Sequence, residues 1–451
     1  MGVILYTALA AGTVLAAAAA ERTRTCRAGT RGALLRRTAL VLLALILIVP
    51  AALRQETGND YLRYVEFFHL ASIDSYVPTE AGFNLLVKAL YLLCGYENYL
   101  LIFGVFSVWT IGNLLLVVWR QAEDFTFSFF LFMMFGYYFQ SFNTVRYYLA
   151  LSITLLAMIC ILRKQYVGFM LLVLFAALFH KSALVALVLY PLSLHKWTHM
   201  QRGLAIAAGG LALVFHQRVL DLLVALYPSW EGTRDLAAGT SISWVNIGRC
   251  AAVLLLAVLV QRWRLKAGRE ADTVRTLLSA EATECCRDDG DSAGVAVRSD
   301  DALAGRELRM YINGSFLALL LYVFGWFIPE VSRICYYLTF TQIFLIPMLL
   351  ARIPEDAGMR IVQKPQAGAV KRQNSRIAQG TEQLKCKGKE AFLSKDGACR
   401  RLLTALAILG AGLYFAFFLK TAYRDTIKIL PYKTFLFHDL NQTPSGSVGK
   451  N

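Results

Sequence analysis

Residues 142–157 read FNTVRYYLALSITLLA, in which an asparagine and an arginine are followed at once by apolar sequence. The Arg146 guanidinium keeps its proton in any protein environment. The run that follows has the composition of a helix that crosses a bilayer, for which roughly 20 apolar residues suffice. A charge at the mouth of such a helix needs a partner, a route to the headgroups or a wet cavity. The stretch therefore predicts a spanning helix that holds a charge at one end.

The whole chain has the composition of a membrane protein. Of its 451 residues, 57% are hydrophobic and 17% charged, and the mean hydropathy is +0.51. A soluble domain of this composition would expose large apolar patches, so a bilayer must cover much of the surface. The net charge of +16 comes from Lys and Arg in short connectors, not from a basic domain interleaved with aromatics, which excludes nucleic acid as a partner. Nine cysteines without CxxC spacing indicate neither a disulfide framework nor a zinc site.

Apolar runs long enough to span the membrane recur along the chain. We expect an all-α, polytopic membrane helix bundle of about twelve transmembrane helices. The two runs on either side of His180 are short, and one re-entrant hairpin is an alternative to two spans. The runs lie at 2–20, 35–53, 99–118, 125–140, 145–162, 166–179, 182–194, 203–224, 244–261, 310–328, 334–351 and 402–420.

Charge asymmetry orients these helices. The first run ends in alanines like a cleaved signal peptide, but its arginines follow the apolar residues, which favours a retained helix with its N-terminus outside. The basic connectors near 120, 163, 195 and 261 and in 352–401 then fall on the cytoplasmic side. The loop 54–98, the segments around 143, 180 and 331, and the tail after 421 face outward. The predicted organisation is a bundle (1–261), a flexible connector (262–309), a helix pair (310–351), a basic flexible connector (352–401), and a last helix with its tail (402–451).

Arginines gather on the outer face of this topology. The positive-inside rule leaves outward interfaces poor in Arg, so a group of four calls for an explanation. Each one alone is equally compatible with snorkelling to the headgroups. Together they indicate an anionic ligand at the same depth, because a guanidinium fork matches phosphate oxygens, and a lipid pyrophosphate has that charge. The four are Arg54, Arg146, Arg249 and Arg333.

Two titratable groups are predicted at the same depth. Asp60 lies in the turn sequence TGND, where it is either a functional carboxylate or the partner of an Asx-turn or a nearby arginine. His180, in FHKSA, is either a base near neutral pH or a packed structural histidine. The other carboxylates of 54–98, Glu80 among them, read as a solvated loop surface. The aromatic residues near these positions read mainly as an interfacial belt, and some are expected to stack on sugar rings.

The ordered motifs resemble those of the EpsG family of Wzy-like polysaccharide polymerases. The similarity spans about residues 35–435, with Ala81 and Tyr147 at positions where the family usually has proline and glutamine. The motifs that carry it are RQETGNDYLRY (54–64), EAGF (80–83), NTVR (143–146), FHKSA (179–183), Arg333 with Tyr336 and Tyr337, and PY (431–432).

The resemblance implies a GT-C-like glycosyltransferase of the bacterial inner membrane, with its active site facing the periplasm. Such an enzyme builds exopolysaccharide, capsule or O-antigen by transferring a glycan from undecaprenyl pyrophosphate to a hydroxyl of another lipid-linked repeat unit. It implies membrane lipid and a chain-length regulator as further partners, and no cofactor or metal. The catalytic residues expected are Asp60, His180, Arg146 and Arg333, and the substrate-binding residues are Arg54, Asn143, Arg249, Tyr64, Tyr336 and Tyr337.

Other functions remain open at this stage. A flippase or transporter of lipid-linked sugar would also want outward arginines, although it would favour charges at the midplane. A membrane acyltransferase would use His180, but would more naturally take its donor from the cytosol. A noncatalytic assembly protein is a third alternative. The chain has no P-loop, GxSxG or HExxH motif, so ATP-driven transport and hydrolysis by the usual motifs lack support.

Overall fold

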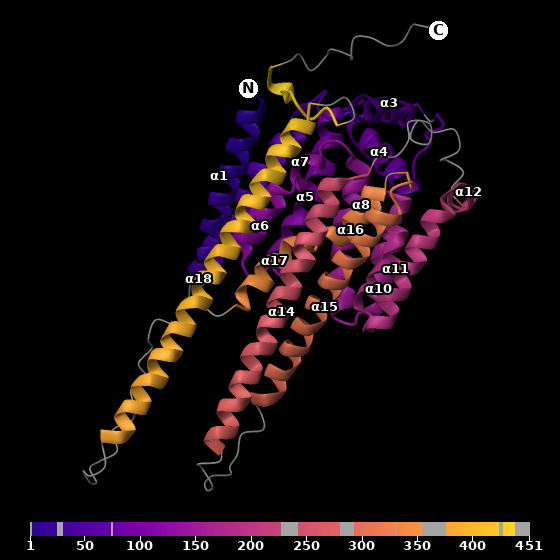
Figure 1. Ribbon diagram of the computed structural model, residues 1–451. Helices are drawn as coiled ribbons and strands as arrows, with labels where there is room; N and C mark the ends of the chain where they lie inside the picture. Colours follow the sequence, from indigo (N-terminus) through magenta and orange to yellow (C-terminus); the bar gives the residue numbers. More distant parts are fainter. Residues whose placement is uncertain are drawn as a thin grey trace.

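The computed structural model describes residues 2–24, 30–73, 75–226, 242–279, 293–329, 331–353, 376–423 and 427–437. In these residues the chain is helical except for two short strands (Figure 1). The elements are α1 (Gly2–Arg22), α2 (Thr30–Ala52), β1 (Arg54–Gln55), α3 (Tyr61–Ser72), α4 (Ala81–Cys94), α5 (Tyr99–Gln121), α6 (Phe125–Met134), α7 (Tyr137–Gln140), α8 (Val145–Leu162), α9 (Tyr166–Ala177), η1 (Lys181–Val185), α10 (Ala186–Leu194), α11 (His199–Val214), α12 (His216–Leu226), α14 (Trp244–Ser279), α15 (Ala293–Phe324), α16 (Val331–Thr339), α17 (Gln342–Ala351), α18 (Arg376–Thr421), β2 (Lys433–Thr434) and η3 (Phe435–Phe437).

The expected polytopic helix bundle is confirmed, and its helices fall into classes by length. Within the described residues, eight helices are long and apolar enough to cross a membrane, or nine if the pair α11 and α12, bent by 86°, is one span. The remaining predicted spans correspond to the shorter helices α6, α9 and η1–α10. At about 1.5 Å per residue, the 12-residue α9 is only about 18 Å long and does not reach across a bilayer of about 30 Å. The predicted count of twelve spans is therefore not confirmed by the described residues.

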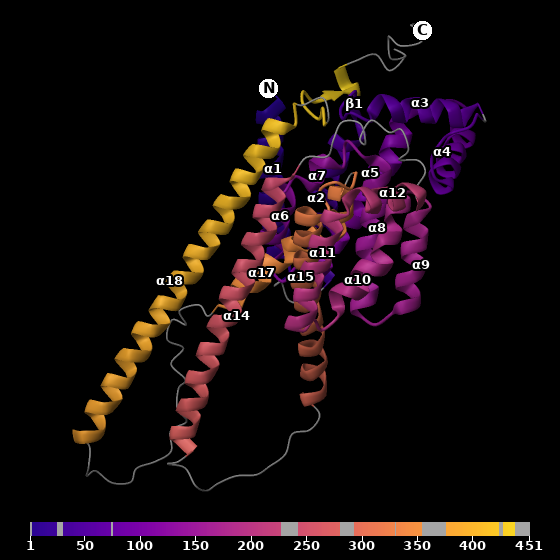
Figure 2. The ribbon, with the colours of Figure 1, turned by 45° about the vertical axis from the view of Figure 1, so that its right-hand side comes forward.

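α8 is the central helix of the bundle. Of its most apolar stretch, 83% is buried within the protein, and the same share holds for α16 and α17 taken together. The corresponding share of α2 is 11%, so α2 keeps most of its apolar surface for lipid. Figure 2 shows α8 and α9 side by side and the C-terminal helix α18 at the rim. The helix that carries Arg146 in its first turn is thus surrounded by protein, and the charge at its start meets neighbouring elements and not the bilayer.

The outward segments predicted from charge meet at one end of the bundle, here called the sheet end because β1 and β2 pair there. The antiparallel pairing places Arg54 opposite Thr434, and Gly58 N–H donates to Lys428 O at 2.8 Å. Gly58 has a φ of +100°, and an added Cβ would lie 2.8 Å from Phe142 O, so only glycine fits this close approach. The sheet, α3 and the start of α1 share this end, while α14, α15 and α18 extend from the opposite one (Figure 1).

Two regions expected to be irregular are helical. Residues 54–98, read as a solvated loop, contain α3 and α4. The connectors 262–309 and 352–401, predicted to be flexible, contain the end of α14 and the beginnings of α15 and α18, while 280–292 and 354–375 lie outside the described residues. Low hydrophobicity predicted the absence of a core in the connectors, but it does not prevent a spanning helix from continuing into water.

Candidate active site at the sheet end

The segment between α9 and η1 places His180 beside α16. His180 precedes η1 in extended conformation, and its Nδ1 accepts a hydrogen bond from Ser182 N at 3.3 Å. The same nitrogen lies 2.8 Å from Ser182 Oγ, which in turn lies 2.9 Å from the Tyr337 hydroxyl. The short chain His180, Ser182 and Tyr337 therefore connects the α9–η1 segment to α16 and fixes the orientation of the imidazole.

Tyr147 joins the start of α8 to the same group. Its hydroxyl donates to the Arg333 backbone oxygen at 2.6 Å, and its ring meets His180 edge-on with centroids 5.5 Å apart. The Arg333 guanidinium carbon lies 6.0 Å from the Tyr147 ring centroid, at the edge of cation–π range. Tyr147 thus ties α16 to α8 and holds Arg333 near the imidazole.

Arg146 forms an ion pair with Glu80. Arg146 Nη1 lies 2.5 Å from Glu80 Oε2, and the two side chains are 19% and 10% exposed. The other oxygen, Glu80 Oε1, accepts from Lys181 N at 3.3 Å, so this carboxylate connects Arg146 to the residue that follows His180. Glu80 is therefore part of the site. Its sequence context had indicated a loop carboxylate in water, and the structure corrects that prediction.

Gly82 allows α4 to approach closely enough for this contact. Its N–H donates to Leu178 O at 2.9 Å, and a Cβ at this position would lie 2.8 Å from that oxygen. Any side chain would push the start of α4 away from the end of α9. The EAGF motif thus has a physical explanation, because its glycine brings Glu80 within reach of both Arg146 and Lys181 N.

The surroundings of His180 keep it neutral. Burial lowers its pKa to about 3, and the positive charges of Arg333 and Arg146 lower the pKa in the same direction. Because Nδ1 accepts from Ser182 N, the single proton of the neutral ring is on Nε2. His180 is therefore a hydrogen-bond donor through Nε2, and in this tautomer it has no nitrogen left to take a proton from a substrate.

The turn that holds Asp60 packs against the same side of the site. Asp60 precedes α3, and its backbone N–H donates to the Asn143 side-chain oxygen at 3.1 Å. The Tyr64 hydroxyl accepts from Arg146 N at 3.3 Å. Asn143 and Tyr64, both predicted to bind substrate, thus hold backbone groups of the site. Burial raises the pKa of the Tyr64 phenol, Arg146 lowers it and Asp60 raises it, so both charges act at this ring.

Arg54 occupies a separate, closed environment. It is 2% exposed, and its guanidinium carbon lies 4.7 Å from the Phe103 ring centroid and 5.5 Å from that of Phe142. Its Nη1 donates to Ala51 O, which closes the C-terminal turn of α2. Burial lowers the pKa of Arg54 to about 10, so it remains charged at neutral pH. Its guanidinium shares no contact with that of Arg146, and the expected meeting of these two arginines is not seen.

Arg249, on α14, lies in a third environment. Its guanidinium is 5.0 Å from the Phe135 ring centroid and 4.9 Å from that of Tyr414. It is buried, and within the described part of the chain none of its side-chain nitrogens has a hydrogen-bond partner. Tyr336 belongs with this group through Tyr137, whose ring centroid is 5.7 Å from that of Tyr336 and 6.0 Å from the Arg249 guanidinium.

The structure therefore brings together one part of the predicted set and separates the rest. His180, Arg146, Arg333, Tyr337, Asn143, Tyr64 and Asp60 share one neighbourhood, whereas Arg54 and the pair Arg249 and Tyr336 lie elsewhere. Glu80, Tyr147 and Ser182 are the additions. No group of three or more His, Cys, Asp or Glu side chains in the described residues is placed to hold a metal ion.

The EpsG family model matches residues 37–362, which include every residue of this neighbourhood. The chain belongs to the EpsG family. The match covers more than half of the sequence and agrees with the resemblance that the motifs indicated. No curated protein and no solved structure matches the chain, so the GT-C-like character of the fold remains a prediction.

Proposed function

We propose that this EpsG-family protein is a polysaccharide polymerase of the bacterial inner membrane. It transfers a glycan from undecaprenyl pyrophosphate to a sugar hydroxyl of a second lipid-linked repeat unit, with the sheet end facing the periplasm. The family supports the class of enzyme. The product is an exopolysaccharide, capsule or O-antigen, and a chain-length regulator is the expected protein partner.

One observation carries the proposal: Arg146, through Glu80 and Lys181 N, and Arg333, through Tyr147, are both held near a neutral histidine at the end of a membrane bundle. Arg146 and Arg333 supply positive charge, and His180 adds an N–H donor while remaining electrically neutral. A pyrophosphate that leaves with two negative charges needs such fixed donors, because they replace the water that would otherwise stabilise it. The partly exposed ion pair of Arg146 with Glu80 keeps the guanidinium oriented before the substrate arrives.

The transfer step balances without a further reagent. The acceptor hydroxyl oxygen forms a bond to the anomeric carbon, and the bond from that carbon to the pyrophosphate oxygen breaks. The electron pair of the broken bond leaves with the pyrophosphate, where Arg146, Arg333 and His180 Nε2–H stabilise the charge. The proton of the hydroxyl passes to a carboxylate.

Asp60 is the carboxylate that we assign as general base. We do not assign this role to His180, because its Nδ1 accepts a hydrogen bond from Ser182 N. Glu80 is engaged with Arg146 and Lys181 N, and its negative charge is needed there. Asp60 lies in the same neighbourhood, since its charge acts on the Tyr64 ring beside Arg146. Replacing Asp60 by Asn should therefore reduce kcat, while the pyrophosphate leaving group still binds.

The decisive experiment uses the purified full chain in lipid nanodiscs with lipid-linked repeat units and no nucleotide or acyl donor. The wild type should lengthen the glycan. Arg146→Ala should lower kcat/KM by about 100- to 1,000-fold, the scale measured for the loss of one donor to a developing anion. Arg163→Ala is the matched control, because Arg163 follows the opposite end of α8 and is exposed there. Equal activity of both variants at equal protein level would refute the assignment of Arg146.

The same assay separates the alternative functions. A flippase would move the lipid-linked glycan between leaflets without lengthening it, and a membrane acyltransferase would need an acyl donor. A noncatalytic assembly protein would show no turnover in a purified system. Glycan lengthening by the purified wild-type protein, without other proteins or donors, excludes all three alternatives. Absence of lengthening with authentic repeat units would overturn the proposed polymerase activity.

A further inference from the structure

Two short helices, α9 and α4, meet end to end at the rim of the bundle. The start of α4 contacts the residue that follows α9, because Gly82 N–H donates to Leu178 O at 2.9 Å. Figure 2 shows α4 beyond the upper end of α9. At about 1.5 Å per residue, the 12-residue α9 is about 18 Å long and the 14-residue α4 about 21 Å. Each alone is shorter than a bilayer core of about 30 Å, and the two together are longer.

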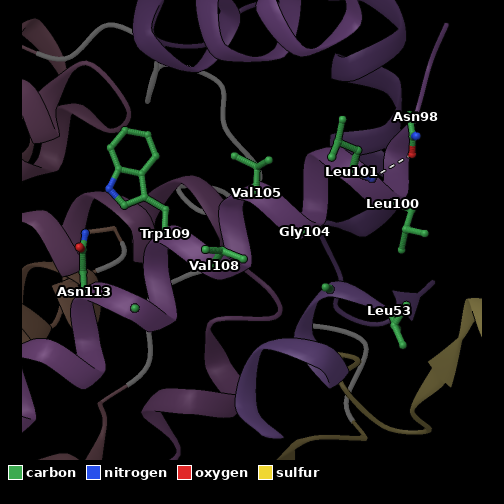
Figure 3. Close-up of a pocket in the computed structure, with 11 residues that line it drawn as sticks. Leu53, Asn98, Leu100, Leu101, Gly104, Val105, Val108, Trp109 and Asn113 are labelled. Atoms are coloured by element: carbon green, nitrogen blue, oxygen red, sulfur yellow. Dashed lines mark hydrogen bonds between the residues drawn. The ribbon is translucent and has the colours of Figure 1, made fainter. Parts of the chain in front are cut away.

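The spanning helix α5 measures the depth of this junction. Its 23 residues make it about 35 Å long, close to the thickness of the bilayer core. The Trp109 ring, near the middle of α5 (Figure 3), packs against Phe179, just after α9, with centroids 5.4 Å apart. Phe83, in the first turn of α4, packs against Phe106 with centroids 5.6 Å apart. Trp109 and Phe106 are 10 and 7 residues from the start of α5 at Tyr99, or about 15 and 10 Å. The junction therefore lies at the depth of the hydrocarbon core.

The outer side of α4 continues the apolar surface of α9. On α4, Leu85, Leu92 and Leu93 are 72%, 69% and 78% exposed. On the α9 side, Leu171 is 62% exposed and Leu178, at the junction, is 47% exposed. Exposed leucines in such a row would form a large apolar patch in water, whereas on a spanning helix they face lipid. The apolar surface of the bundle thus runs past the junction and onto α4.

The neighbouring helix α3 faces a different environment. It packs against α4, and its exposed side chains include Arg63, Glu66 and His69. Charged groups avoid hydrocarbon, so this surface belongs in water. Lys88 is the one charged residue of α4, and a lysine stem is long enough to carry its ammonium to the headgroups. Two helices of one packed unit therefore present a polar and an apolar surface, as expected at a membrane boundary.

We infer that α4 is embedded in the leaflet at the sheet end and forms, together with α9, one broken transmembrane span whose outer side contacts acyl chains. Non-helical backbone at membrane depth has to be satisfied within the protein. At the break this is the case, because Glu80 Oε1 accepts from Lys181 N and Leu178 O accepts from Gly82 N–H. Glu80 also pairs with Arg146, so this ion pair lies at the break, below the membrane surface and not on it.

Photoreactive lipids locate α4 in the wild-type chain. The full protein is placed in nanodiscs that contain a phospholipid with a diazirine either near the end of an acyl chain or on the headgroup, and labelled peptides are identified by mass spectrometry. The acyl-chain probe should label α4 and α9 to a similar extent and α3 about tenfold less, because burial of even one leucine favours the embedded position by more than about tenfold. Labelling of α4 no stronger than that of α3, or by the headgroup probe alone, would overturn the inference.

A crosslinker on α4 distinguishes lipid from a protein partner. The photocrosslinking amino acid benzoylphenylalanine replaces Leu93 on α4 in one variant and Glu66 on α3 in the matched control, and both positions are exposed, so the fold accommodates the added ring. In cell membranes the Leu93 variant should form phospholipid adducts, and the control about tenfold fewer. Adducts mainly to a second copy of the chain or to another protein would show that protein covers α4 and would refute the inference. Neither experiment depends on catalysis, so either result leaves the proposed polymerase activity to its own test.

Discussion

Arg54 and Arg146 both lie at the sheet end, yet their surroundings differ in a way that separates a structural charge from an available one. Arg54 is enclosed by Phe103 and Phe142 and bonded to the Ala51 carbonyl, and the cavity beside it has a volume of only about 10 Å³, too small for a phosphate group. Arg146 is partly exposed and paired with a carboxylate, so an incoming anion can share or replace its partner. Position near the membrane surface is therefore not sufficient evidence that an arginine is functional. The partners of the guanidinium determine whether it is available to a ligand.

The two arginines should differ most when each is replaced, in a separate variant, by methionine, which keeps an unbranched apolar stem but is shorter and carries no charge. Arg146→Met should lower kcat/KM by about 100- to 1,000-fold with little change in thermal stability, because an anion-stabilising donor is lost. Arg54→Met should leave kcat/KM close to wild type, because the Arg54 guanidinium is buried and donates its hydrogen bonds to Ala51 O and Ser107 Oγ within the protein. Activity and thermal unfolding of both variants in detergent are the measurements. Loss of activity with a retained fold in Arg54→Met would place Arg54 in the catalytic machinery after all.

The sequence could predict which segments share one end of the bundle but not the contacts between them. Each spanning helix is encoded by a local apolar run, and the basic connectors order the ends, so the sequence predicts that the segments without basic connectors lie together. The ion pair of Glu80 with Arg146 joins residues 66 positions apart and has no local signature. The sequence analysis also did not predict α4. Its apolar residues, such as the exposed Leu85 and Leu93, do not form a run long enough to span the membrane, so they were interpreted as part of a loop. The burial of Arg54 ran against the expectation that arginine is exposed.

Glu80 sharpens the comparison, because Arg146 has this carboxylate partner and Arg54 has none among the residues that the structure describes. Glu80→Gln keeps the size of the side chain but removes the charge that orients Arg146 and weakens its bond to Lys181 N. We expect kcat to fall about tenfold, a loss of roughly 1.4 kcal/mol in the transition state, because the donor is less well placed. KM should not rise, since a carboxylate that competes with the pyrophosphate for Arg146 is gone.

A fall in kcat without a rise in KM is a result that a purely structural role of Glu80 would not produce. Steady-state kinetics of purified Glu80→Gln measures the changes in kcat and KM. Glu56→Gln is the control, because Glu56 pairs with Lys433 at the exposed edge of the sheet. A rise in KM at unchanged kcat would mean that Glu80 itself contacts the substrate, and unchanged kinetics would remove it from the site.

The smallest expected effect concerns the neutral His180, which the charge of Arg146 and Arg333 and its own burial keep unprotonated. Its pKa in the folded state is about 3, below the value of about 6.5 for an unfolded chain, so on acidification the unfolded state takes up the proton first. His180 therefore makes the fold less stable as the pH falls, by about 1 kcal/mol between pH 6.5 and 5.5. His180→Gln removes this dependence, and the stability of the wild type relative to the variant should decline over that interval. Thermal unfolding of both proteins at the two pH values measures the difference. A constant difference would mean that His180 titrates alike in both states, and the assignment of its Nε2–H as a neutral donor to the pyrophosphate would lose its electrostatic basis.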